Sequence, residues 1–298
     1  MIADLACREC GSDDVDLLDV LPDGRRRVCC VECGSSWVRG TAVAPKKPKP
    51  LPTFDELKRT FPSTEDVSPE RLAHGNALKQ RYLAEVSPEP DPAVAPFWAK
   101  YQRIFSAEGL PSAAPQDLKD FANLSVGANP GNMSVFNTEW NRIGDDAAAA
   151  QVRRTVEYLL RGPESTPLED RLTQLIDDTT SVGMKGFREA LLTKVLCIVH
   201  PGEYLTILKY TGTAGKLEIA RAVWGIELPD PQRVTWTIGR LIVWSNTLLR
   251  ALIGDGFETQ EHAAAFLWWA KDQPFDGPVP DARPAAVDPR NDRSSFDA

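Results

Sequence analysis

The stretches Cys7-Arg-Glu-Cys10-Gly and Cys30-Val-Glu-Cys33-Gly decide the fold of the first forty residues. In each stretch two thiols three residues apart are followed by a glycine, so a tight turn can direct both sulfurs to one metal ion. Nineteen residues separate the two pairs, which is enough for a hairpin that returns the second pair to the first. We therefore predict one tetrahedral metal site made by Cys7, Cys10, Cys30 and Cys33.

The residues between the pairs have the pattern of that hairpin. Val15–Val20 alternates weakly, Pro22-Asp-Gly24 has turn chemistry, and residues 25–29 can return as the paired strand. Over about 35 residues the chain resembles the zinc-ribbon superfamily. The resemblance implies zinc, and a closed four-cysteine site leaves no open coordination position, so we expect the zinc to fold the module without taking part in catalysis.

Cys29 is the alternative to Cys30 as a ligand. Three residues separate Cys29 from Cys33, whereas two residues separate Cys30 from Cys33, as in the first cysteine pair. We therefore assign Cys30 as the ligand. Five of the six cysteines fall within the first 33 residues, a distribution typical of metal binding in a reducing compartment. The chain contains no apolar stretch near the ~20 residues that cross a bilayer and no signal-peptide pattern at its start, so we predict a cytoplasmic protein.

Three arginines, Arg25, Arg26 and Arg27, follow the turn of the predicted hairpin. Strand alternation places Arg25 and Arg27 on one face and Arg26 on the other, and the first two are the expected phosphate contacts. The net charge of the whole chain is −8, so nucleic-acid binding requires such a local patch. Residues 1–52 hold eight acidic and eight basic residues, and a charged strand edge exposed to solvent explains the arginines equally well.

Composition divides the chain into four parts. Residues 1–40 are the zinc ribbon, and 41–52, with four prolines and three lysines, read as an extended linker. Residues 53–273 have helical periodicity throughout, whereas 274–298, with five prolines and five aspartates, predict a disordered tail. The hydrophobic share of 42% is ordinary for a folded protein.

The fold class predicted for this chain is mainly α, with about nine or ten helices after the small β ribbon. Thr53 with Glu56, and Thr166 with Glu169, have the spacing of capping boxes at helix starts. The segment Tyr204–Tyr210 alone reads as a strand. Apolar residues at helical spacing predict helices over 69–86, 94–108, 115–124, 145–161, 167–179, 187–199, 215–225, 231–253 and 260–272.

No catalytic residue can be assigned from the sequence. Thr211-Gly-Thr-Ala-Gly-Lys216 has two residues between its glycines where the Walker A motif has four, and Leu217 replaces its hydroxyl residue, so a nucleotide site of that kind is excluded. The three histidines of the chain lie far apart in the sequence. None has a second metal ligand or a catalytic nucleophile at a spacing typical of such a site. We therefore expect a protein that is not an enzyme, with an enzyme of unrecognised type as the third alternative.

The segment Val182–Ala190 invites comparison with the helix-hairpin-helix turn, whose glycine amides hold a DNA phosphate. Gly183 and Gly186 are three residues apart where that motif has two, so a plain turn between helices is the favoured interpretation. Lys185 and Arg188 remain candidates for nucleic-acid contact. The tryptophans of 231–253 and of Phe266-Leu-Trp-Trp are expected to be core residues.

A second resemblance covers residues 97–272. Asn129-Pro-Gly-Asn132, Gly183-Met-Lys-Gly-Phe, residues 190–207 and Phe266-Leu-Trp-Trp269 look like the helical region in front of the motor domain of McrB-type restriction ATPases and related bacterial defence proteins. The resemblance implies a sensing or assembly role that is often directed at DNA. The leading hypothesis is thus a binding protein for nucleic acid or a nucleic-acid-processing complex, and the alternative is a zinc-ribbon adaptor between proteins.

Overall fold

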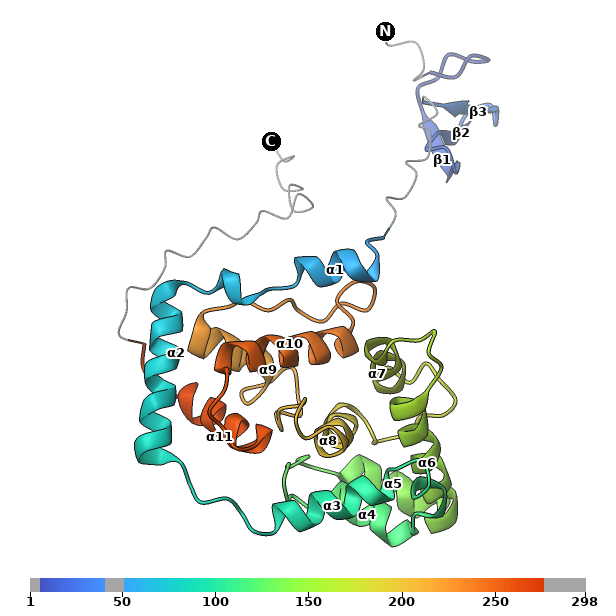
Figure 1. The fold of residues 1–298 in the computed structure, drawn as a ribbon. Helices are drawn as coiled ribbons and strands as arrows, with labels where there is room; N and C mark the ends of the chain where they lie inside the picture. Colours follow the sequence, from blue (N-terminus) through green and yellow to red (C-terminus); the bar gives the residue numbers. More distant parts are fainter. Residues whose placement is uncertain (1–5, 41–50, 276–298) are drawn as a thin grey trace. The chain divides into compact units, whose positions relative to one another are not determined.

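The computed structural model describes residues 6–40 and 51–275, which divide into two compact units with their boundary between Pro52 and Thr53 (Figure 1). Residues 41–50 of the predicted linker and 276–298 of the predicted tail lie outside the described residues. The first unit is a small sheet and the second is helical. The predicted fold class is therefore confirmed.

The first unit is a three-stranded antiparallel sheet in the order β1-β2-β3. Its strands are β1 (Val15–Val20), β2 (Arg26–Cys30) and β3 (Ser36–Arg39). The turn between β1 and β2 contains Gly24 at a φ of +80°, a left-handed conformation that glycine adopts without strain. The returning strand begins one residue later than predicted, at Arg26.

The second unit holds eleven α-helices among its described residues, two of which continue into single π turns at Tyr82–Val86 and Ala220–Trp224. The α-helices are α1 (Phe54–Thr60), α2 (Pro69–Arg81), α3 (Val94–Ile104), α4 (Pro115–Asn123), α5 (Ser134–Ile143), α6 (Asp145–Arg161), α7 (Leu168–Ile176), α8 (Glu189–Val199), α9 (Lys216–Ile219), α10 (Ile238–Ile253) and α11 (Gln260–Ala270). Helix α5 is absent from the prediction.

Two of the predicted helix starts differ from the structure. The capping box at Thr53 is present, with both reciprocal hydrogen bonds to Glu56. The box predicted at Thr166 is wrong, because α7 begins after Pro167 with no side-chain cap. Helix α10 begins seven residues later than predicted, because the Gln232 amide donates to the Trp236 carbonyl and closes a loop there.

The segment Tyr204–Tyr210 has no regular secondary structure and pairs with no strand in the described part of the chain, so the predicted strand is wrong. Side chains and a neighbouring turn satisfy its backbone instead. The Leu205 amide donates to Asn246 Oδ1 on α10 at 2.9 Å, and the Tyr210 amide donates to Glu189 Oε1 on α8 at 2.6 Å. The Lys209 carbonyl accepts from the Lys216 amide at 3.1 Å. The tyrosines, threonine and isoleucine of this segment favour a strand, yet its backbone hydrogen bonds go to residues of helices.

Helix α8 is the centre of the helical core, and residues 190–198 are all buried. It packs against α3, α6 and α7 (Figure 1). Helix α10 lies against α7, and the crossing is close because Gly239 has no Cβ to overlap the Glu169 carbonyl. Trp244 of α10 is buried against Phe54 and Phe61 at ring distances of 5.3 and 5.7 Å, as the core interpretation requires. The other predicted core tryptophans, Trp236, Trp268 and Trp269, are only partly buried against the core.

Candidate metal centre and basic residues

The two cysteine turns have the same hydrogen-bond pattern. The Gly11 amide donates to the Cys7 carbonyl at 2.9 Å, and the Gly34 amide donates to the Cys30 carbonyl at 3.0 Å. Both glycines have positive φ, +79° and +71°, which explains why glycine follows each pair. In each turn the first cysteine is buried and the second is exposed. The two Cys-x-x-Cys-Gly sequences thus form a structural repeat.

The four sulfur atoms of these turns gather at one point. All lie within 4.8 Å of one another, with Cys7 Sγ 3.5 Å from Cys33 Sγ and Cys10 Sγ 3.5 Å from Cys30 Sγ. A tetrahedral ion with metal–sulfur bonds of about 2.3 Å requires sulfurs roughly 3.8 Å apart. None of the four is in a disulfide. The cluster is therefore compatible with one bound metal ion.

One ligand is prepared for ionisation by the local backbone. Hydrogen bonds from the amides of Cys10 and Glu9 lower the pKa of Cys7 to about 7. A thiolate, not a thiol, is the form that binds a metal ion. The turn geometry thus favours the ligand form of this cysteine.

Cys29 lies outside the cluster. Adjacent residues of a strand project to opposite faces, and Cys29 Sγ lies 3.4 Å from the Gly34 carbonyl oxygen. Cys30, in contrast, is buried among the other three sulfurs. The structure thus places Cys30, and not its neighbour, with the candidate ligands.

The three arginines of the hairpin have different surroundings. Arg25 forms an ion pair with Asp23 at 2.7 Å, and Arg27 lies 3.5 Å from the Asp19 carboxylate. Arg26 has no such partner among the described residues and lies directly opposite Arg39 in the β2–β3 ladder. The two expected phosphate contacts, Arg25 and Arg27, therefore each have an acidic neighbour that would compete with a phosphate.

Lys185 and Arg188 belong to the other unit. Arg188 pairs with Asp178 at 3.0 Å and donates to the Ile176 carbonyl, so its guanidinium holds the turn before α8. Gly186 has a φ of +84°, and a Cβ there would overlap the backbone of Phe136 on α5. Lys185 is exposed. Gly186 thus serves the packing of this turn against α5, in agreement with the favoured interpretation of a plain turn.

The sequence analysis missed two buried lysines, Lys194 and Lys216, both with 0% exposure. Burial lowers the pKa of each to about 8. The Lys194 ammonium donates to the carbonyls of Phe121 and Leu124 at the end of α4, whereas Lys216 Nζ has no hydrogen-bond partner. The signal for Lys194 was available, because it interrupts an otherwise apolar run on a buried helix.

None of the helices in the described parts of the chain is long and apolar enough to cross a membrane. Within those parts, the four cysteines are the one group of potential ligands gathered at metal-binding distance. Comparison with known proteins found no matching family model, curated protein or solved structure.

Proposed function

We propose that the chain is a non-enzymatic binding protein whose first unit is a zinc ribbon held together by a structural metal ion. The four-thiolate cluster carries this proposal. Four cysteine sulfurs complete a tetrahedral shell, so a zinc ion there has no position left for water or substrate. Zinc is the metal we propose because it prefers a four-thiolate tetrahedral site and undergoes no redox chemistry. A metal ion of this kind shapes a recognition surface.

The surface we propose for recognition is one face of the ribbon sheet. Directly opposite residues of neighbouring strands project to the same face, which puts Arg26 beside Arg39. Trp37, two residues before Arg39, shares that face and is half-buried. Two adjacent guanidinium groups repel each other unless an anion lies near them, and an indole can stack on a base. We propose that this face binds nucleic acid.

The resemblance of residues 97–272 to the helical region of McrB-type restriction ATPases is consistent with this proposal. It suggests that the target is nucleic acid handled by a defence or restriction complex. The helical unit would then provide the assembly surface.

A second candidate function, a protein adaptor, is favoured by the edge strand β1. Leu17, Leu18 and Val20 are 55–60% exposed on that strand. Exposed apolar side chains on an unpaired strand edge are suited to docking another protein. The two functions differ in how the binding affinity depends on salt concentration. Contacts with phosphate weaken steeply as the salt concentration rises, whereas apolar contacts do not.

The test is binding of the full chain to short single-stranded and duplex oligonucleotides over a range of salt concentrations. The double change Arg26→Ala and Arg39→Ala should lower affinity for every sequence and reduce the salt slope by about 1.8, at about 0.9 for each lost phosphate contact. Arg25→Ala with Arg27→Ala is the matched control and should have a smaller effect. Leu18→Ser should leave the affinity unchanged. Absence of binding at low salt would remove the nucleic-acid proposal in favour of the adaptor.

A further inference from the structure

Two cavities meet on the exposed side of helix α10. One, of about 410 Å³, lies between α10 and the segment that follows α1, and the other, of about 570 Å³, lies between α10 and the loop before α11. Thr247 and Ala251 of α10 line both cavities, and both residues are exposed. The two cavities are therefore parts of one continuous groove, which we call the α10 groove.

The lining of the α10 groove changes along its length. Its apolar end is lined by Phe61, Pro62, Trp244 and Leu248, and its polar end by Arg250, Asp255 and Gln260. From Trp244 to the C-cap residue Gly254 the helix rises by about 15 Å. An extended peptide covers that distance with about four or five residues. The groove thus has the length of a short extended peptide that carries an apolar side chain at one end.

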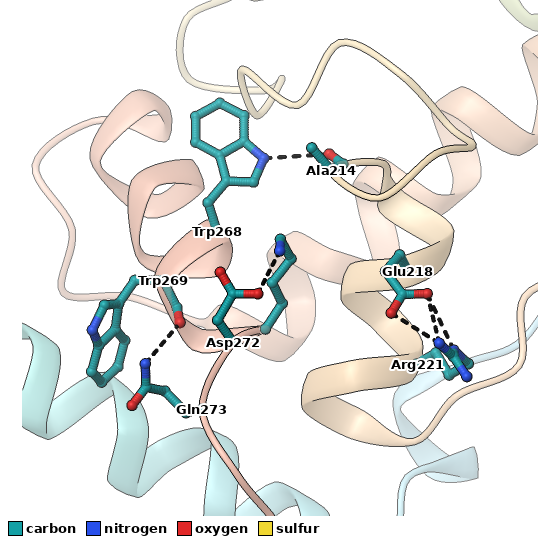
Figure 2. A network of polar contacts seen from close by, with 8 residues as sticks. Ala214, Glu218, Arg221, Trp268, Trp269, Asp272 and Gln273 are labelled. Carbon is teal, nitrogen blue, oxygen red and sulfur yellow. Dashed lines mark hydrogen bonds and ion pairs between the residues drawn. The ribbon is translucent and has the colours of Figure 1, made fainter.

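Three basic residues line the α10 groove, and no ion pair joins any of them to an acidic residue in the described part of the chain. They are Lys58 and Arg59 at the apolar end and Arg250 at the polar end. By contrast, Figure 2 shows Arg221, outside the groove, bound to Glu218 at 2.9 Å. The groove therefore presents positive charges that have no counter-ion.

Arg59 is the groove cation with an acidic residue nearby. Its Nε donates to the Asp55 carbonyl at 3.2 Å, and its charge lowers the pKa of Glu56. The Glu56 carboxylate, however, accepts hydrogen bonds from the amide and hydroxyl of Thr53 at 2.8 and 2.9 Å. It is thus held at the start of α1 and does not line the groove.

Arg250 is half-buried at the polar end of the groove, and its guanidinium makes no hydrogen bond to any described residue. Its Nε is shielded from solvent as well. A buried donor without an acceptor costs free energy, and folded chains seldom contain one. Asp255 lines the same cavity but does not pair with this arginine. The guanidinium is therefore available to an acceptor that enters the groove.

We propose that the α10 groove binds an extended acidic segment of a partner protein, with an apolar side chain of that segment at the Trp244 end. Charge complementarity selects this partner. Three basic residues and one carboxylate line the groove, whereas the whole chain carries a net charge of −8. A carboxylate supplies the acceptor that Arg250 lacks, because it can take two parallel hydrogen bonds from one guanidinium.

A nucleic acid is the other polyanion that such a charge could attract, and the apolar end of the groove disfavours it. Single strands bind basic grooves with their bases stacked on aromatic rings. Phe61 and Trp244 are 8% and 3% exposed and pack against each other, so neither ring has a free face for a base. All lining residues belong to the helical unit, so this proposal is independent of the nucleic-acid binding proposed for the ribbon.

The test measures binding of a capped peptide, Glu-Asp-Phe-Glu-Asp, to the full chain by calorimetry at low salt. The peptide with glutamine and asparagine in place of its acids should bind at least about tenfold more weakly. Arg250→Met, which keeps the aliphatic stem, should cause a similar loss, and Arg221→Met is the matched control and should cause none. Ala251→Leu fills the groove without changing its charge and should also weaken binding about tenfold. Because Ala251 is exposed, this variant should keep the melting temperature of the unchanged chain.

Three results would overturn the proposal. The first is no binding of the acidic peptide by the folded, unchanged chain, and the second is equal binding by Arg250→Met and Ala251→Leu. The third is a single-stranded oligonucleotide that displaces the peptide and binds Arg250→Met more weakly, because the groove would then be a nucleic-acid site. The double change Arg26→Ala and Arg39→Ala should leave peptide binding unchanged, which separates failure of this proposal from failure of the ribbon proposal.

Discussion

Removing the metal ion should unfold the ribbon, residues 6–40, while the helical unit stays folded. Val28 is the one aliphatic side chain below 9% exposure in the described ribbon, and the other buried apolar residues there are Cys7 and Cys30. Burying a valine contributes roughly 1.5–3 kcal/mol. Ordering the backbone of a single residue costs about 1–2 kcal/mol, so this core offsets the ordering of about two residues. The ribbon therefore depends on another source of stability.

The proposed structural zinc ion would supply that stability. Zinc binding to small modules of this kind contributes about 10–16 kcal/mol at neutral pH. The dispersed amide signals of the ribbon in ¹H–¹⁵N spectra should collapse on chelation, while the helical signal in circular dichroism keeps its melting temperature. Metal analysis of the untreated chain should give one zinc ion per chain.

Cysteine variants make the same test specific. Cys10→Ser and Cys33→Ser should lose the metal, because each removes one of four ligands. Cys29→Ser is the matched control and should keep it, because that sulfur lies outside the cluster. Ribbon signals that remain dispersed after chelation would refute the reasoning, and so would zinc retained by both ligand variants or lost from the control.

Three further predictions concern the rest of the chain. Gly239→Ala should destabilise the helical unit by about 2 kcal/mol or more, because a Cβ there overlaps α7, whereas Gly202→Ala, with open space around it, should be nearly neutral in chemical denaturation. Lys216→Met should raise the free energy of unfolding at pH 7 by at most about 3 kcal/mol, because burial lowers the pKa of this lysine from 10.5 to about 8. The melting temperature should rise with it. The difference in stability between this variant and the unchanged chain should disappear as the pH rises from 8 to 10.5. In that range the unfolded chain holds the proton that folded Lys216 releases, so rising pH stabilises the unchanged chain. Trypsin should cleave first within 41–52 at the bond after Lys46, because prolines follow Lys47 and Lys49, and leave a product beginning at Lys47. An early cut inside the helical unit would contradict this.

The features that the sequence predicted correctly are governed by neighbouring residues. The cysteine turns need only the two thiols and the glycine that follows them. The capping boxes show the limit of such rules. Thr53 caps its helix, but Thr166 does not, because Pro167 takes the N-cap position of α7 and the helix begins at Leu168. The residues of a capping box allow the threonine to cap the helix but do not require it. The packing around the helix start decides whether the cap forms.

The features that the sequence missed depend on residues distant in the chain. Tyr204–Tyr210 has strand residues, but Asn246 and Glu189 satisfy its backbone from two helices. The burial of Lys216, whose Nζ makes no hydrogen bond, becomes visible only in the folded chain.

The two units rely on different sources of stability, and this difference separates them experimentally. The ribbon has little core, so if the proposed zinc ion holds it together, chelation should end any nucleic-acid binding by Arg26 and Arg39. The helical unit has an extensive core around α8, which can bear an unpaired ammonium such as Lys216. Chelation should therefore leave the melting temperature of the helical unit unchanged. A lower melting temperature after chelation would mean that the helical unit requires the folded ribbon, contrary to the placement of its buried core within residues 53–275.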